Sequence, residues 1–221
     1  MEKRIVIFGA GGAGREVLQV IRDINAVRPT WSCEGFIVDS EFQGVPSAGG
    51  LPVLGNIDWL AANPDAHVVV AVGASAARWR VVQRIRERCT NPFPVLIHPR
   101  AWLGTNIQVG DGSVICAGAM LTTDIQVGEH VHVNIASSIA HDAVLGDFAT
   151  LYAGVHVTGN VHLHDGVEAG TGSVVIPRCV VGHWAIIGAG AVVTGEVTEN
   201  CTVVGAPARV VKQRPEGWQQ A

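Results

Sequence analysis

An imidazole stands directly before a carboxylate at His141-Asp142, and this pair has the chemistry of a proton acceptor. A histidine side chain titrates near neutral pH, and a neighbouring carboxylate can fix its tautomer and raise its basicity. A lone histidine is more often only a solvated side chain. The pair therefore marks a candidate general base, whose reaction depends on what surrounds it.

A glycine-rich loop near the N-terminus has the chemistry of a phosphate site. It consists of Gly9, Gly11, Gly12, Ala13 and Gly14, in the spacing G-x-G-x-x-G between an apolar run and a helical pattern. Backbone N–H groups and a helix N-terminus can face a phosphate there, and Asp39, after the next expected strand, can accept a ribose hydroxyl. The pattern also fits a dinucleotide, but the repeat that begins at Ile97 leaves no separate domain for hydride transfer. A nucleotide-sugar diphosphate suits the same loop.

Thiol and metal chemistry have little support in the sequence. The five cysteines are scattered without a CxxC motif: Cys33, Cys89, Cys116, Cys179 and Cys201. Cys179 falls at an inward position of the repeat described below, and no base is evident beside Cys116 or Cys201. No three histidines have a convincing zinc spacing. We expect no metal, and we expect the following histidines to be solvated: His130, His132, His156, His162, His164 and His183.

The elements that must position these residues change character near residue 97. The first part alternates strand and helix patterns: strands at 4–10, 35–39, 51–55, 67–73 and 94–98, and helices at about 14–25, 56–62 and 75–88. Apolar strands that alternate with helices predict a small α/β unit with a mostly parallel sheet. This Rossmann-like unit spans residues 1–96 and carries the glycine-rich loop, so we expect it to bind the nucleotide.

From Ile97 onward the sequence repeats every six residues. The first position of each hexapeptide is Ile, Leu or Val in sixteen of seventeen frames, and the exception is Ala169. The fifth position holds only Ala, Ser, Cys, Val or Ile. Strands have a period of two and helices of 3.6, whereas three short strands per coil give a period of six. We predict a prism of stacked coils over 97–200, each coil stabilised by its neighbours, and a C-terminal extension over 201–221.

Composition narrows the class of protein. The chain has 221 residues, of which 48% are hydrophobic and 15% are charged, so it can bury a substantial core. A formal charge of −4 argues against non-specific nucleic-acid binding. No apolar run approaches the roughly 20 residues that span a bilayer, so we expect no membrane attachment. The absence of a secretory pattern and of paired cysteines favours the cytoplasm.

Several motifs together resemble a known family. They are GAGGAGREVLQVI at 9–21, GFIVDS at 35–40, VAVGASAARWRVV at 70–82, IHPRA at 97–101, NIASSIAHDAVLGDF at 134–148, TGNV at 158–161, IIGAGAVV at 186–193 and VVGAPARVV at 203–211. The chain resembles the sugar O-acyltransferases of the sialic acid O-acetyltransferase (NeuD) type. That group includes PglD-like N-acetyltransferases acting on nucleotide-linked aminosugars.

The resemblance implies a fold, a cosubstrate and residue roles. It implies a left-handed parallel β-helix, a homotrimer and acetyl-coenzyme A as acyl donor, with His141 as general base, Asp142 beside it and Asn134 as a positioning residue. It places Gly159 where a backbone N–H meets the thioester carbonyl. The candidate coenzyme A contacts are Gly172, Ala189, Pro207 and Ala208. Gly73 and Arg78 belong to a second loop, where Arg78 either contacts phosphate or is solvated on a helix face. Ala13 stands where the family commonly has histidine.

Three functions remain open at this stage. The leading one is acetylation of the amino group of a nucleotide-linked deoxyaminosugar, and the second is O-acetylation of sialic acid or another sugar. The third is a non-catalytic trimeric β-helix that binds a nucleotide. A γ-class carbonic anhydrase shares the β-helix but needs three histidines on zinc, which the sequence does not provide, and it leaves the α/β unit unexplained.

Overall fold

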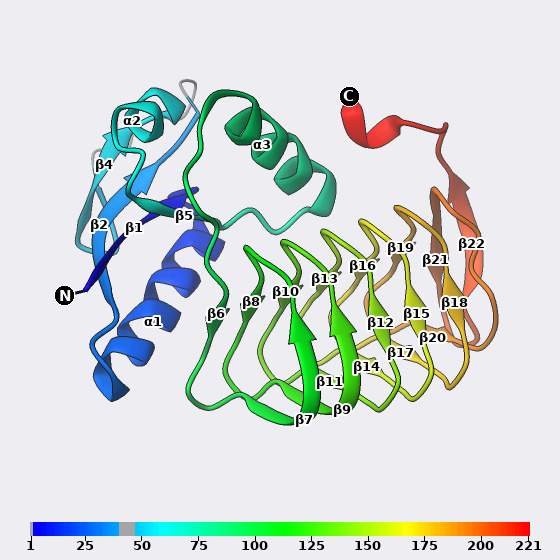
Figure 1. Ribbon diagram of the computed structural model, residues 1–221. Helices are drawn as coiled ribbons and strands as arrows, with labels where there is room; N and C mark the ends of the chain where they lie inside the picture. Colours follow the sequence, from blue (N-terminus) through cyan, green and yellow to red (C-terminus); the bar gives the residue numbers. More distant parts are fainter. Residues whose placement is uncertain (1, 40–46) are drawn as a thin grey trace.

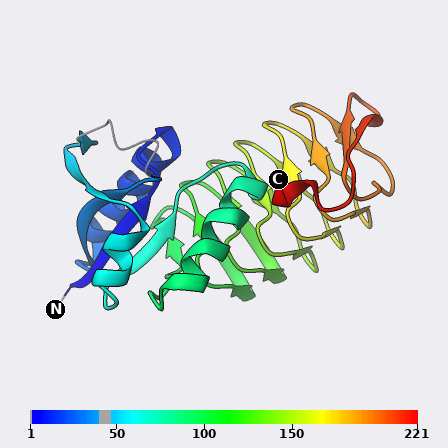
Figure 2. The same cartoon turned by 90° about the horizontal axis from the view of Figure 1, so that it is seen from above.

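The computed structural model describes residues 2–39 and 47–221, in which an α/β unit is followed by a long prism of stacked coils (Figures 1 and 2). Ser40, the last residue of the GFIVDS motif, lies outside the described residues. The fold is an N-terminal Rossmann-like unit followed by a left-handed parallel β-helix, and the predicted fold class is confirmed. Within the described part of the chain, no helix is long and apolar enough to cross a membrane.

The α/β unit is built on a sheet whose strand order is β3-β4-β2-β1-β5. Its strands are β1 (Lys3–Phe8), β2 (Trp31–Ile37), β3 (Ser47–Ala48), β4 (Leu51–Gly55) and β5 (His67–Val70), and its helices are α1 (Gly12–Val27), α2 (Ile57–Ala62) and α3 (Ser75–Arg88). All pairs are parallel except β3 with β4. Side chains alternate along β1, so that Ile5 and Ile7 pack with α1, whereas Val6 and Phe8 pack with α2 and α3.

The predicted strand at 94–98 belongs to the prism instead of the α/β sheet. Only β6 (Leu96–Ile97) forms there, and it pairs with β8 (Val114–Ile115). The side chain of Leu96 is fully buried in the cluster beneath α1, while its main chain continues the stack of coils. An apolar run signals burial but does not specify the backbone partner, which explains the difference.

The prism has three faces. The first face contains β6, β8, β10 (His132–Val133), β13 (Thr150–Leu151), β16 (Glu168–Ala169), β19 (Ile186–Ile187) and β21 (Cys201–Val204), with β22 (Arg209–Gln213) antiparallel at its edge. The second contains β11 (Ser138–Ile139), β14 (His156–Val157), β17 (Val174–Val175) and β20 (Val192–Val193), and the third contains β12 (Val144–Leu145), β15 (His162–Leu163) and β18 (Val180–Val181). The longer strands β7 (Trp102–Val109) and β9 (Met120–Val127) run through both the second and third faces.

Successive coils are offset by 18 residues, since Val133 pairs with Leu151 and Ile139 with Val157. The last coil is shorter, because Ile187 pairs with Val203, an offset of 16 residues. In one coil the chain turns at 134–137, 140–143 and 146–149. We call the equivalent turns of all coils corner A, between the first and second faces, corner B, between the second and third, and corner C, between the third and first.

The repeat positions predicted to face inward form the prism core. From Ile115 to Val193, every first position of a hexapeptide is buried, and most fifth positions are fully buried. Ile97 differs, since 37% of its surface is exposed, and Leu103 and Val109 are only partly buried. These residues lie in the first coil, which has no preceding coil to cover it.

Helix α3 packs along corner C of the prism. His130 lies between Phe93 and Phe148, with ring centroids 4.7 and 5.2 Å away. Further along, Trp184 meets Trp79 of α3 edge to face at 6.3 Å. Our expectation that His130 and His132 are solvated is wrong: both point away from the prism core, but the α/β unit covers them, leaving 0% and 7% of their surfaces exposed.

Candidate active site

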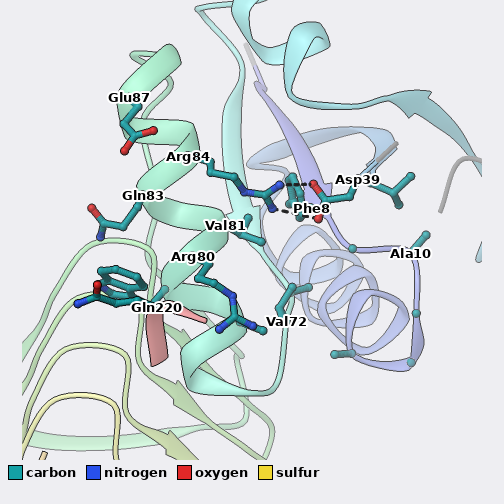
Figure 3. A pocket seen from close by; sticks show the side chains of 18 residues that line it. Phe8, Ala10, Asp39, Val72, Arg80, Val81, Gln83, Arg84, Glu87 and Gln220 are labelled. Atoms are coloured by element: carbon teal, nitrogen blue, oxygen red, sulfur yellow. Dashed lines mark hydrogen bonds and ion pairs between the residues drawn. The ribbon is translucent and has the colours of Figure 1, made fainter. Parts of the chain in front are cut away.

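A cavity of about 1010 Å³ opens between the glycine-rich loop and α3 (Figure 3). Its walls include Gly9, Gly11, Gly12 and Ala13 from the loop, Asp39 after β2, and Arg80, Arg84 and Glu87 from α3. The glycine-rich loop and Asp39, which were singled out from the sequence, thus line the same cavity. The α3 residues and the C-terminal Gln220, which also lines the cavity, were missed.

The loop is shaped by close packing of its main chain. A Cβ atom on Gly14 would lie 1.9 Å from the carbonyl oxygen of Gly9, so only glycine lets α1 approach β1 this closely. Gly9 itself has φ +107°. The N-cap residue Gly11 offers no side-chain hydrogen bond to the first turn of α1. The helix N-terminus therefore lies at the cavity with the partial positive charge that favours an anion.

Asp39 is held in a two-pronged ion pair across the cavity. Arg84 donates from Nη1 and Nη2 to the two carboxylate oxygens at 2.8 and 3.0 Å (Figure 3). Each carboxylate oxygen keeps a further lone pair, so the pair orients Asp39 and still lets it accept another hydrogen bond. Arg80 and Arg84 are four residues apart on α3, a spacing that puts both on one helix face and that the sequence displayed.

Neither alternative expected for Arg78 is correct. Its surface is 0% exposed, and it donates to main-chain carbonyls on both sides of the junction between the α/β unit and the prism. Nη1 reaches Val72 and Gly73 at 2.7 and 2.9 Å, Nε reaches His130 at 2.9 Å, and Nη2 reaches Phe148 at 2.8 Å. Burial lowers the pKa of this guanidinium to about 10. Arg78 and Gly73 therefore join the two parts of the chain and do not line the cavity.

His141 and Asp142 lie at corner B, more than half exposed. Nδ1 of His141 is 2.8 Å from Oδ2 of Asp142, and their side chains are 57% and 56% exposed. Asp142 has φ 58°, the left-handed turn conformation that aspartate tolerates better than most residues. The imidazole lies over Gly159 of the next coil, where a Cβ atom would be 2.6 Å from Cε1 and Nε2. Because Asp142 contacts Nδ1, the second ring nitrogen, Nε2, remains to interact with a bound molecule.

The remaining predicted residues lie at a different corner. Asn134 is at corner A, and its side chain donates to the carbonyl of Leu151 at 3.0 Å. Gly172 and Ala189 occupy corner A of later coils, while Pro207 and Ala208 lie in the turn between β21 and β22. Within one chain the structure therefore does not bring Asn134 beside His141, and neither residue lines the cavity.

Across residues 2–39 and 47–221, no three or more His, Cys, Asp or Glu side chains are grouped so that they could hold a metal ion.

Comparison with known proteins shows that the chain is similar to sugar-modifying acetyltransferases. Residues 4–85 match the family model of the PglD N-terminal domain. A GDP-perosamine N-acetyltransferase of Escherichia coli O157:H7 is 31% identical over 137 residues, which cover 62% of this chain and 61% of that protein. The match thus spans less than two thirds of the relative's length.

Solved structures match nearly the whole chain. WeeI from Acinetobacter baumannii AYE is 31% identical, with a TM-score of 0.84 over 95% of this chain and 100% of that one. The acetyltransferase domain of PglB from Neisseria gonorrhoeae FA1090, in complex with acetyl coenzyme A, is 28% identical, with a TM-score of 0.83 over 96% and 100% of the two chains.

Proposed function

The chain belongs to the sugar O-acyltransferase family of the sialic acid O-acetyltransferase (NeuD) type, which includes PglD-like enzymes, and from this we propose that it acetylates the amino group of a nucleotide-linked deoxyaminosugar. The acyl donor is acetyl-coenzyme A. The name of the E. coli relative supports the acceptor, and the ligand of the PglB domain supports the donor.

The observation that carries this proposal is the His141-Asp142 pair over Gly159 at corner B. Asp142 accepts the Nδ1 proton of His141, which leaves Nε2 as the proton acceptor. The neutral amine attacks the thioester carbonyl and loses a proton to Nε2. The N–H of Gly159 stabilises the tetrahedral oxyanion, which collapses to the amide while coenzyme A leaves as a thiolate and takes the proton from His141.

The cavity at the glycine-rich loop binds the nucleotide sugar in this proposal. The N-terminus of α1 faces the diphosphate through main-chain N–H groups, and Asp39 accepts a hydrogen bond from the ribose. Ala13 lines the cavity where the family commonly has histidine, so this loop contributes backbone groups and no imidazole.

A homotrimer would complete the site. The cavity, corner A and corner B lie apart in one chain, so a neighbouring copy must bring the base to the sugar nucleotide. Residues 1–96 form the nucleotide-binding domain, 97–200 the acyltransferase domain and 201–221 the extension. Coenzyme A runs past Gly172, Ala189, Pro207 and Ala208, and Asn134 at corner A positions its neighbour's substrate. Five free cysteines fit a cytoplasmic location.

The proposal is tested by release of coenzyme A thiol from acetyl-coenzyme A in the presence of candidate acceptors. The panel contains UDP-, GDP- and dTDP-linked 4-amino-4,6-dideoxysugars, 3-aminosugars and free sialic acid. We expect turnover on an aminosugar nucleotide, with the amide identified by mass spectrometry. Turnover on sialic acid alone would replace the proposal by O-acetylation, and no turnover would support a non-catalytic nucleotide-binding protein.

The role of His141 is tested by His141→Ala. We expect kcat to fall by roughly 10²-fold or more, the usual scale for loss of a general base. The side chain is 57% exposed, so the melting temperature should stay at the parent value. Near-parental turnover in this variant would remove His141 from the mechanism.

A further inference from the structure

The C-terminal segment, residues 214–221, returns from the prism to α3 (Figures 1 and 2). Its start is tied to corner C, because the Gln213 side chain donates to the carbonyl of Glu199 at 3.0 Å and the Arg214 N–H donates to that of Asn200 at 2.8 Å. The Arg214 guanidinium then lies 4.7 Å from the ring centroid of Trp218. A short 3₁₀ helix, η2 (Trp218–Gln220), packs against α3.

This segment forms part of the cavity wall. Gln220 lines the cavity, although all the other lining residues come from the first 87 positions of the chain. The residue before it, Gln219, accepts a hydrogen bond from Nη1 of Arg80 at 2.8 Å through its main-chain carbonyl. Figure 3 shows Arg80 and Gln220 on the same side of the cavity. The path of the segment therefore decides where the Arg80 guanidinium is held.

The charges around the cavity single out Arg80. Arg84 and Asp39 form a two-pronged pair and largely neutralise each other. The partner of Arg80 is a neutral carbonyl, so this guanidinium keeps its charge and most of its five N–H donors. Across the same cavity lies the N-terminus of α1, which also favours an anion. A diphosphate between the two would meet positive potential from both sides.

We propose that residues 214–221 form part of the nucleotide-sugar binding site. The Gln219 carbonyl positions Arg80 for the diphosphate, and the Gln220 side chain contacts the bound nucleotide sugar. The inference rests on the proposed function and extends it to specific residues. Holding a flexible cation in its bound position lowers the entropy cost of binding. Loss of the segment should therefore weaken nucleotide binding and leave the acetyl-coenzyme A reaction at corner B intact.

The test compares binding of GDP, UDP and dTDP, by isothermal titration calorimetry, to the full chain and to a chain that ends at Glu216. For whichever diphosphate binds the full chain, we expect a dissociation constant roughly tenfold higher for the shortened chain, and at least as high for Arg80→Ala, the scale of one lost hydrogen bond to a charged group. In steady-state assays KM for the nucleotide sugar should rise, while KM for acetyl-coenzyme A should not.

Three further variants sharpen the test. Glu216→Ala, an exposed change in the same segment, should bind like the parent. Gln220→Ala should weaken binding in the full-length chain, so the proposal remains testable if the shortened chain does not fold. Arg80→Ala in the shortened chain should bind more weakly than Arg80→Ala alone by no more than the loss measured for Gln220→Ala, because the contact between Gln219 and Arg80 is already absent.

The outcomes separate this inference from the proposed function. If the full chain binds no nucleoside diphosphate, both are refuted. If the full chain binds one and the shortened, well-folded chain binds it equally, only the role of the segment is refuted. Parental binding by Gln220→Ala would refute the direct contact assigned to that side chain.

Discussion

Replacing Gly159 with alanine should impair the function of His141 by displacing its imidazole, while His141 itself remains unchanged. A Cβ atom at Gly159 would lie 2.6 Å from Cε1 and Nε2 of the imidazole, whereas ordinary contacts begin at 3.4 Å. The ring must therefore withdraw by about 0.8 Å, the difference between the two, and a displacement near 1 Å can cost about 10²-fold in rate. We expect kcat for Gly159→Ala to fall by roughly that factor.

The melting temperature should stay near the parental value, because the side chain of His141 is 57% exposed and can move into solvent. The backbone of Gly159 also lies outside the left-handed region, so alanine is not strained there. The assay is steady-state release of coenzyme A thiol, together with the melting temperature. The matched control is Gly195→Ala, two coils further along corner B, where a Cβ atom meets nothing within 4 Å. That variant should keep the parental kcat.

A double-mutant comparison isolates the mechanism. In a His141→Ala background the clash no longer exists, so adding Gly159→Ala should change kcat very little. Parental kcat in Gly159→Ala would refute the reasoning. An equal loss with and without His141 would show that Gly159 acts by some route other than displacement of the imidazole.

Two further predictions concern the buried junction between the α/β unit and the prism. Desolvation lowers the pKa of His130 to about 3 and that of His132 well below its usual range, so below pH about 6.5 the unfolded chain binds protons that the folded chain does not. The free energy of unfolding should fall by about 1.4 kcal/mol per pH unit for each histidine between pH 6 and 5. Urea unfolding at several pH values measures this slope, and His132→Val should remove one histidine's share; an unchanged slope would contradict the assignment. Arg78→Met leaves several carbonyls without a donor and should cost about 3 kcal/mol or more in urea unfolding, whereas Arg88→Met, on an exposed ion pair of the same helix, should cost well under about 1 kcal/mol.

The prism was predictable because its constraint is local and repeated. Each hexapeptide carries its own inward residues, so the register could be read without knowing any distant contact. Even Ile97 fits this logic, since its exposure reflects the missing coil before it. The strand at Trp31–Ile37 begins earlier than the predicted range of 35–39. Its pairing register with β1 shifts just before Gly35, so the alternation of side chains in 35–39 does not continue back to Trp31.

The junction was not predictable, because outward positions of the prism have two different environments. His130 and His132 point away from the core as expected, yet the α/β unit covers them. Arg78 looks like a helix-surface residue until α3 docks on corner C. These outcomes depend on how two units pack, which no local pattern encodes.

The sequence indicated which residues could form the candidate site, but it did not indicate which of them lie next to each other. Asn134 and His141 are seven residues apart, and a six-residue repeat places such residues at different corners, so their separation could have been deduced. The spacing of Arg80 and Arg84 on a predicted helix was also available. Gln220 was not, because its place depends on the path of the chain after β22.

The stacking of coils sets the scale on which this architecture can be lengthened or shortened. Neighbouring strands in a sheet are about 4.8 Å apart, and one coil takes 18 residues. Inserting a whole coil between the one that carries Phe148 and the one that carries Trp184 would move later coils by one such step and keep every corner in its column. Inserting six residues would instead rotate all later side chains onto the next face. Whole coils are therefore the units in which the prism can be lengthened or shortened without disturbing its corners.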